Sequence, residues 1–138
     1  MRILPSLLAA CDRRRQPALV SAHCDLPCGV YDPAQARVEA ESVKAIMDKY
    51  NGSDDMAFKA RALGVKEGRA DMVKHHLWVL WTDYFKPPHL DLYPNLHDLF
   101  WNATKTAGAC KGSTDPAVGQ KLLDQIDEIA TIFWKTKS

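Results

Sequence analysis

The sequence predicts an all-α protein, an antiparallel up-down four-helix bundle that follows a short N-terminal metal-binding hook. Apolar residues recur at helical spacing in four stretches, and no stretch alternates convincingly with the period of a strand. Short connections between these stretches favour antiparallel neighbours. Of the 138 residues, 46% are apolar and 25% are charged, as in ordinary globular domains. We therefore expect one domain that buries a core without disulfides.

The first two helices are predicted from their start and stop signals. Asp32 is a plausible N-cap with Pro33 at the first helical position, and Asn51-Gly52 ends that helix. The second helix is expected from residue 53 or 54 to about Phe85. We expect the first helix to turn Val38, Ala45, Ile46 and Tyr50 inward, and the second Phe58, Ala62, Leu63, Val65, Met72, Leu77, Leu80, Trp81 and Tyr84.

The glycines and prolines that follow set further expectations. Gly64 and Gly68 weaken the second helix by roughly 1 kcal/mol each, so we expect one of them to permit close packing. Residues 86–95 are predicted to be a loop, because Pro87 and Pro88 cannot continue a helix.

The last two helices are predicted over about 94–110 and from Asp115-Pro116 onward. Cys110, on an apolar helical face, is expected to be a buried small hydrophobe. The predicted inward residues are Leu96, Leu99, Phe100, Ala103 and Ala107 in the third helix, and Val118, Leu122, Ile126, Ile129 and Phe133 in the fourth.

Charge and composition exclude several classes of partner. With 18 basic and 17 acidic residues, the net charge of +1 gives no electrostatic case for nucleic acid or an anionic membrane surface. No apolar run approaches the roughly 18 residues that a membrane span needs. Four cysteines are too few for a disulfide-dense secreted scaffold. We expect a soluble protein in the cytoplasm, with export as the alternative.

Residues 1–22 differ from the rest and predict a processed leader, which leaves 23–138 as the mature bundle domain. A short apolar run is followed by Arg13, Arg14 and Arg15, and the stretch ends in a small-residue sequence, Val-Ser-Ala, that resembles a cleavage site. The arginines interrupt the apolar segment that a secretory signal requires. The alternative is a frayed N-terminal tail. Cys11, within this stretch, has no predicted role.

The stretch "HCDLPC" contains the residues that could bind a metal ion. His23, Cys24 and Cys28 can close around one soft or borderline metal. A structural zinc site would usually take a second ligand pair, and a thioredoxin-like motif would have two intervening residues. Cleavage before His23 would add a free amine and the amide of Cys24. Two nitrogens and two thiolates make a planar set suited to Ni(II) or Cu(II), and an axial imidazole would favour a higher oxidation state.

Three stretches resemble the nickel-containing superoxide dismutases: "HCDLPCGVYDPAQARVEAESVKA", "KHHLWVLWTDYFKPPHLDLYPNLH" and "GSTDPAVGQKLLDQIDEIATIFWKTK". The resemblance covers nearly all of residues 23–138, with the hook at 23–31. It implies disproportionation of superoxide to dioxygen and hydrogen peroxide by Ni(II)/Ni(III) cycling, with one nickel per subunit, a homohexamer and a leader peptidase. The alternative is a non-catalytic nickel-binding or thiol redox-sensing protein.

The resemblance also implies roles for individual residues. The nickel ligands would be His23, Cys24 and Cys28, while Tyr31 and Asp25 would restrict access to small anions. Pro27 would turn the hook, Glu39 and Arg69 would orient the axial histidine, and Tyr84 would support the hook. Apart from the resemblance, Lys86 and Lys111 are candidates for attracting superoxide, and the alternative is that they are ordinary solvated surface lysines. We expect His75, His76, His89 and His97 to be core or surface residues.

Overall fold

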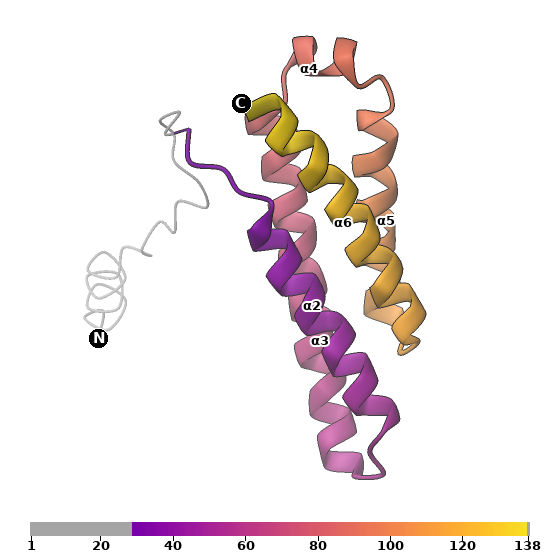
Figure 1. Cartoon of the computed structure of the whole chain (residues 1–138). Helices are drawn as coiled ribbons and strands as arrows, with labels where there is room; N and C mark the ends of the chain where they lie inside the picture. Colours follow the sequence, from indigo (N-terminus) through magenta and orange to yellow (C-terminus); the bar gives the residue numbers. More distant parts are fainter. Residues whose placement is uncertain (1–28, 138) are drawn as a thin grey trace, which may run out of the picture.

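The computed structural model describes residues 29–137, and this part of the chain is helical and contains no strand (Figure 1). Four long helices alternate in direction. None of the described helices is long and apolar enough to cross a membrane. The elements are α2 (Ala34–Asn51), α3 (Met56–Val79), the π-helical turn η1 (Leu80–Tyr84), α4 (Pro87–Leu92), α5 (Leu96–Gly112) and α6 (Pro116–Lys137).

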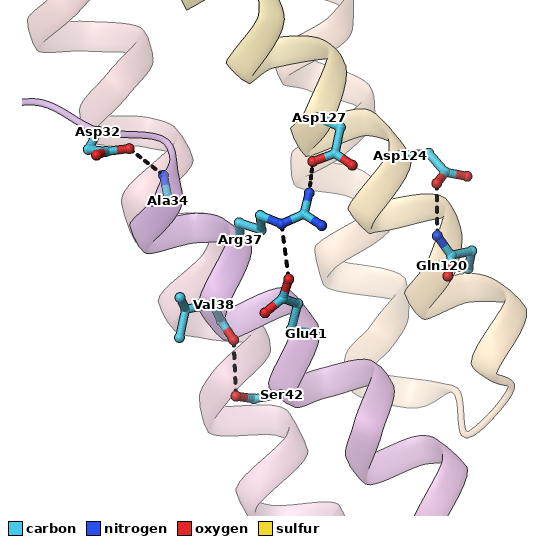
Figure 2. A network of polar contacts seen from close by, with 9 residues as sticks. All are labelled: Asp32, Ala34, Arg37, Val38, Glu41, Ser42, Gln120, Asp124 and Asp127. Carbon is cyan, nitrogen blue, oxygen red and sulfur yellow. Dashed lines mark hydrogen bonds and ion pairs between the residues drawn. The ribbon is translucent and has the colours of Figure 1, made fainter.

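The four long helices close into a ring around one core. α2 packs against α3 and α6, and α5 packs against the same two helices. An ion pair ties the first half of α2 to α6, because the Arg37 guanidinium binds both Asp127 and Glu41 (Figure 2). The predicted all-α, up-down four-helix bundle is confirmed.

The predicted inward faces of α5 and α6 are confirmed. All five residues predicted in α5 are buried, and in α6 only Val118 is half-buried. Cys110 is fully buried, as expected. These two helices each carry a single clear apolar stripe, so helical periodicity alone identifies the face that packs.

The predicted inward face of α2 is wrong. Val38 is 58% exposed and Ala45 is also exposed, while Ile46 and Tyr50 are half-buried. The helix has apolar residues on two sides, and the bundle buries the side with the smaller residues, which lets α3 and α6 approach closely. The buried residues of α2 are Ala36, Ala40, Val43 and Met47.

The expectations for α3 are confirmed in part. Ala62, Leu77 and Leu80 are buried, whereas Phe58, Val65 and Met72 are exposed. Neither of its glycines permits close packing, since a Cβ added at either one would meet no atom within 4 Å. The close approach occurs at Gly119 of α6 instead, where an added Cβ would lie 3.0 Å from the Lys44 Cβ.

The predicted loop over residues 86–95 is wrong, because most of it forms the short helix α4. Pro87 and Pro88 occupy its first two positions. A proline there has no intrahelical hydrogen bond to lose and its fixed φ suits the first turn. The His89 Nδ1 accepts a hydrogen bond from the Lys86 backbone N–H at 3.2 Å and closes this turn. The π-helical turn η1 sits just before it and ends α3 earlier than predicted.

Candidate metal centre and the adjoining pocket

The predicted site residues divide between two parts of the chain. Tyr31, Glu39, Arg69 and Tyr84 belong to the described structure. The predicted metal ligands His23, Cys24 and Cys28, together with Asp25, Pro27 and the predicted leader, lie outside the described residues. Within residues 29–137, no three His, Cys, Asp or Glu side chains are grouped so as to hold a metal ion.

The lead-in segment, residues 29–33, contains the last three residues of the predicted hook and joins the hook to α2. Gly29 has a φ of +70°, a left-handed conformation that is strained for residues with a side chain. The Asp32 carboxylate accepts the Ala34 backbone N–H at 2.8 Å (Figure 2). It thus forms a local turn before the helix rather than the predicted N-cap, a position that Pro33 takes. The chain therefore turns at both ends of this segment.

Tyr31 packs against Tyr84, with ring centroids 5.8 Å apart. The Tyr84 hydroxyl lies 2.9 Å from the Thr136 Oγ1, and the Tyr84 ring lies 4.4 Å from the Phe133 ring. The His89 ring stacks on the Tyr84 ring at 5.6 Å. Contacts from α4 and α6 therefore fix Tyr84, at the end of η1, as a platform against which Tyr31 packs.

A pocket of about 420 Å³ opens beside this platform. Its lining includes Gly29 and Tyr31 from the lead-in segment and Lys86, His89 and Lys137 from the end of the bundle. Asp83 is the carboxylate in the lining, against two lysines, so the pocket favours a small anion. Because Gly29 lines this pocket, the predicted hook is joined to the described structure at the pocket itself.

Glu39 and Arg69 form a second pair at another place. One Arg69 nitrogen donates to both Glu39 carboxylate oxygens, at 3.1 and 3.2 Å, and links α2 to α3. The Glu39 side chain is 13% exposed and the Arg69 side chain 48%. The pair lines a groove with Val38, Ile46 and Val65, and this groove shares no lining residue with the Tyr31 pocket. Tyr31 therefore contacts Tyr84 and Glu39 contacts Arg69, but the two pairs line different pockets.

The two lysines proposed to attract superoxide lie at different places. Lys86 lines the Tyr31 pocket. Lys111 is in the last turn of α5, at the opposite end of the bundle, and pairs with Asp71 at 2.9 Å (Figure 1). The described geometry therefore places only the first of them beside the pocket.

Sequence reasoning missed the pocket residues His89, Thr136 and Lys137. They lie far along the chain from Tyr31, and no motif connects them. One usable signal exists: Thr136 and Lys137 follow Phe133 by three and four residues, so they continue the buried stripe of α6. The end of that stripe marks the end of the bundle where the lead-in segment docks.

The fold and the pocket define a class: helical-bundle proteins in which a sequence that bears cysteine and histidine precedes a tyrosine-lined, cationic pocket in the chain. The chain matches the nickel-containing superoxide dismutase family over residues 18–137, and it belongs to that family. It is accordingly a nickel-dependent enzyme that disproportionates superoxide to dioxygen and hydrogen peroxide.

Known relatives agree over most of the chain. The "Superoxide dismutase [Ni]" of Streptomyces seoulensis is 64% identical over 118 residues, which are 86% of this chain and 90% of that protein. The enzyme of the same name from Streptomyces coelicolor is 63% identical over 118 residues, with the same coverage. A native nickel superoxide dismutase structure matches with a TM-score of 0.81 and 62% identity, over 83% of this chain and 98% of that one.

Proposed function

We propose that this chain builds its nickel site from His23, Cys24 and Cys28 once residues 1–22 have been removed. The donor chemistry carries the proposal. Cleavage before His23 frees an amine beside the Cys24 amide, and two thiolates complete a planar set of two nitrogens and two sulfurs. The family to which the chain belongs contains nickel, and nitrogen and thiolate donors of this kind would suit that metal.

The bound nickel would supply one-electron redox chemistry, and the chain's own residues would control access and protons. Two superoxide anions and two protons yield one dioxygen and one hydrogen peroxide. Tyr31 stands at the pocket on its Tyr84 platform, and with Asp25 it would admit only small anions. The Tyr31 phenol is one group able to hold a proton there. Lys86 would draw the anion toward the pocket.

Glu39 and Arg69 would orient the imidazole of His23. Glu39 lies six residues beyond Pro33, about 9 Å along the axis of α2. The stretch from His23 to Gly29 spans up to ~20 Å when extended, so this role requires the groove to lie within that distance of Gly29. The low exposure of Glu39 and its hydrogen bonds to Arg69 fix the position of the carboxylate, which a group that orients an imidazole requires.

The first test is intact mass with metal analysis on protein from nickel-supplemented cells that can process the leader. A chain that begins at His23 and holds one nickel per subunit is expected. A matched chain with one extra residue before His23 should lose activity, because its amine is no longer in place. Cys24→Ser and Cys28→Ser should do the same. A carrier that uses only thiolates would tolerate the extension, and untrimmed or zinc-loaded protein would contradict the proposal.

The proposed assembly is a homohexamer. We propose that it forms after a leader peptidase has removed residues 1–22 and that it is located in the cytoplasm. Exposed apolar side chains support self-association: Val38 is 58% exposed, Trp78 50% and Trp101 59%. Faces of this kind commonly mark contacts between chains. Light scattering on the purified mature protein should give six times the subunit mass. A monomer would contradict the assembly, and fractionation of cells would show whether the protein is exported.

A further inference from the structure

The last turn of α6 holds the lead-in segment. The Lys137 Nζ donates a hydrogen bond to the Tyr31 backbone carbonyl at 2.9 Å. One residue earlier, the Thr136 hydroxyl contacts the Tyr84 hydroxyl and donates to the Phe133 carbonyl at 2.8 Å. The same helical turn therefore fixes the backbone of Tyr31 and the side chain on which the Tyr31 ring rests.

Two aromatic rings of α6 hold the ammonium group of Lys137 in position. It lies 5.0 Å from the centre of the Phe133 ring and 5.5 Å from that of the Trp134 ring. Such cation–π contacts favour one position of a flexible lysine. A cation at the C-terminal end of a helix also interacts favourably with the helix dipole. These contacts within α6 orient the Lys137 side chain independently of its hydrogen bond to the lead-in segment.

The charge of Lys137 is available to the pocket. Among residues 29–137, no carboxylate forms an ion pair with it, and its hydrogen-bond acceptor is a neutral carbonyl. Lys86 and Asp83 are the other charged groups in the same lining. Lys137 therefore leaves the described pocket with a net positive charge.

We propose that Lys137 is a positioning residue for the metal centre: it fixes the Tyr31 backbone and so sets where the preceding residues of the hook, which carry the predicted ligands, meet the pocket. Tyr31 is only three residues beyond Cys28, so movement of the Tyr31 backbone would also move the predicted ligands. This inference rests on the proposed nickel ligands. It assigns no proton or electron transfer to Lys137.

The test uses Lys137→Met, which keeps the length of the stem and removes the donor. Lys121→Met is the matched control, since Lys121 is an exposed lysine about 24 Å away along the same helix. Lys137→Arg restores a charged donor. Each mature, nickel-loaded protein is challenged with EDTA, and nickel loss is followed by its thiolate absorption. In nickel-free protein, hydrogen exchange is measured over residues 29–36.

We expect Lys137→Met to release nickel roughly fivefold faster and to exchange faster over residues 29–36, with an unchanged melting temperature. Lys121→Met should match the wild type, and Lys137→Arg should recover most of the loss. Wild-type nickel retention and exchange in Lys137→Met would overturn the inference, as would an equal change in Lys137→Arg or Lys121→Met. Failure of the wild type to hold nickel would instead count against the proposed ligands.

Discussion

Lys66 is a lysine enclosed in the bundle, with 1% of its surface exposed. Its Nζ donates to the backbone carbonyls of Cys110, Lys111 and Ser113, at 2.5, 2.6 and 2.8 Å. The last carbonyls of a helix have no partner within the helix, and a buried helix end must find one elsewhere. Lys66 supplies all three protons of its ammonium to the C-terminal end of α5 and so joins α3 to α5.

Replacing Lys66 with methionine should therefore destabilise the fold. The stem keeps its volume, but three carbonyls lose their donor. Replacing both partners of a buried polar pair by apolar groups is often nearly neutral, yet here only the donor is removed and the acceptors stay unsatisfied. We expect Lys66→Met to lower the free energy of unfolding by about 2–3 kcal/mol, measured by urea denaturation. Lys49→Met, at an exposed position of α2, is the control and should change it little. Equal stability of the two variants would contradict the capping role.

Cys110 makes stability depend on pH in the alkaline range. Burial raises the pKa of its thiol from 9.0 to about 11, against the opposing effect of the Lys66 charge. Well below pH 9 the thiol is protonated in folded and unfolded chains alike, so its contribution is complete. Between pH 9 and 11 only the unfolded chain releases the proton, and stability falls. Burial lowers the pKa of Lys66, which acts in the opposite direction.

Comparison with Cys110→Ala isolates the thiol from the lysine. The stability difference between wild type and variant should be constant up to about pH 9. It should then shrink by about 2–3 kcal/mol as the pH rises to 11. Urea denaturation under reducing conditions at several pH values measures this difference. A gap that stays constant to pH 11 would show that Cys110 ionises as readily in the folded chain as in the unfolded one.

Among the glycines of residues 29–137, the closest packing occurs at Gly119, where α6 crosses α2. A Cβ on Gly119 would meet the Lys44 Cβ at 3.0 Å, the Lys44 Cα at 3.1 Å and the Met47 Sδ at 3.2 Å. The backbone atom cannot move without displacing α2. Gly119→Ala should therefore destabilise the bundle by about 1–2 kcal/mol, although alanine is the better helix former.

The matched control is Gly68→Ala, also inside a long helix. An added Cβ there meets no atom within 4 Å, so only the gain in helix propensity remains. This variant should be more stable by up to about 1 kcal/mol. Thermal unfolding of the two variants should shift the melting temperature in opposite directions. A stabilised Gly119→Ala chain would mean that α2 and α6 can separate without cost.

Elements also show how far the sequence could predict the structure. The faces of α5 and α6 followed from periodicity, because each has one apolar stripe. The face of α2 did not, since Val38 and Ile46 are larger than Ala36 and Ala40 and drew the prediction to the wrong side. Which face of α2 is buried depends on the packing of the whole bundle, because the small residues of one face allow neighbouring helices to approach closely. The prolines of α4 misled in the same way, since their effect depends on whether they begin a helix or interrupt one.

The candidate site could likewise be predicted from the sequence only in part. The predicted ligands His23, Cys24 and Cys28 are adjacent in sequence, so spacing and donor chemistry were enough to propose them. The packing of Tyr31 on Tyr84 joins segments far apart in the chain, and only the family resemblance suggested it. Lys137 had no signal beyond the buried stripe of α6. Contacts between distant segments depend on the assembled fold, which local patterns do not encode.

At the scale of the whole molecule, the two ends of the bundle differ. One end carries the lead-in segment, α4 and the C-terminal turn of α6, and the chain leading to the predicted hook emerges there (Figure 1). The other end is closed by the connections of α2 to α3 and of α5 to α6. With a net charge of only +1, any attraction of superoxide depends on where individual lysines lie. Lys86 lies at the pocket, while Lys111 lies at the far end beside Asp71.

This asymmetry predicts different effects from reversing the two charges. Lys86→Glu should lower kcat/KM for superoxide by roughly threefold to tenfold at low ionic strength, because it turns an attractive potential at the pocket into a repulsive one. The difference from wild type should fade as salt shortens the screening length to a few ångströms. Lys111→Glu faces Asp71 and should mainly cost stability, with a smaller effect on rate. Pulse radiolysis over a range of salt concentrations measures both. Equal losses in the two variants would show that the lysines act on the approaching anion from either end of the bundle.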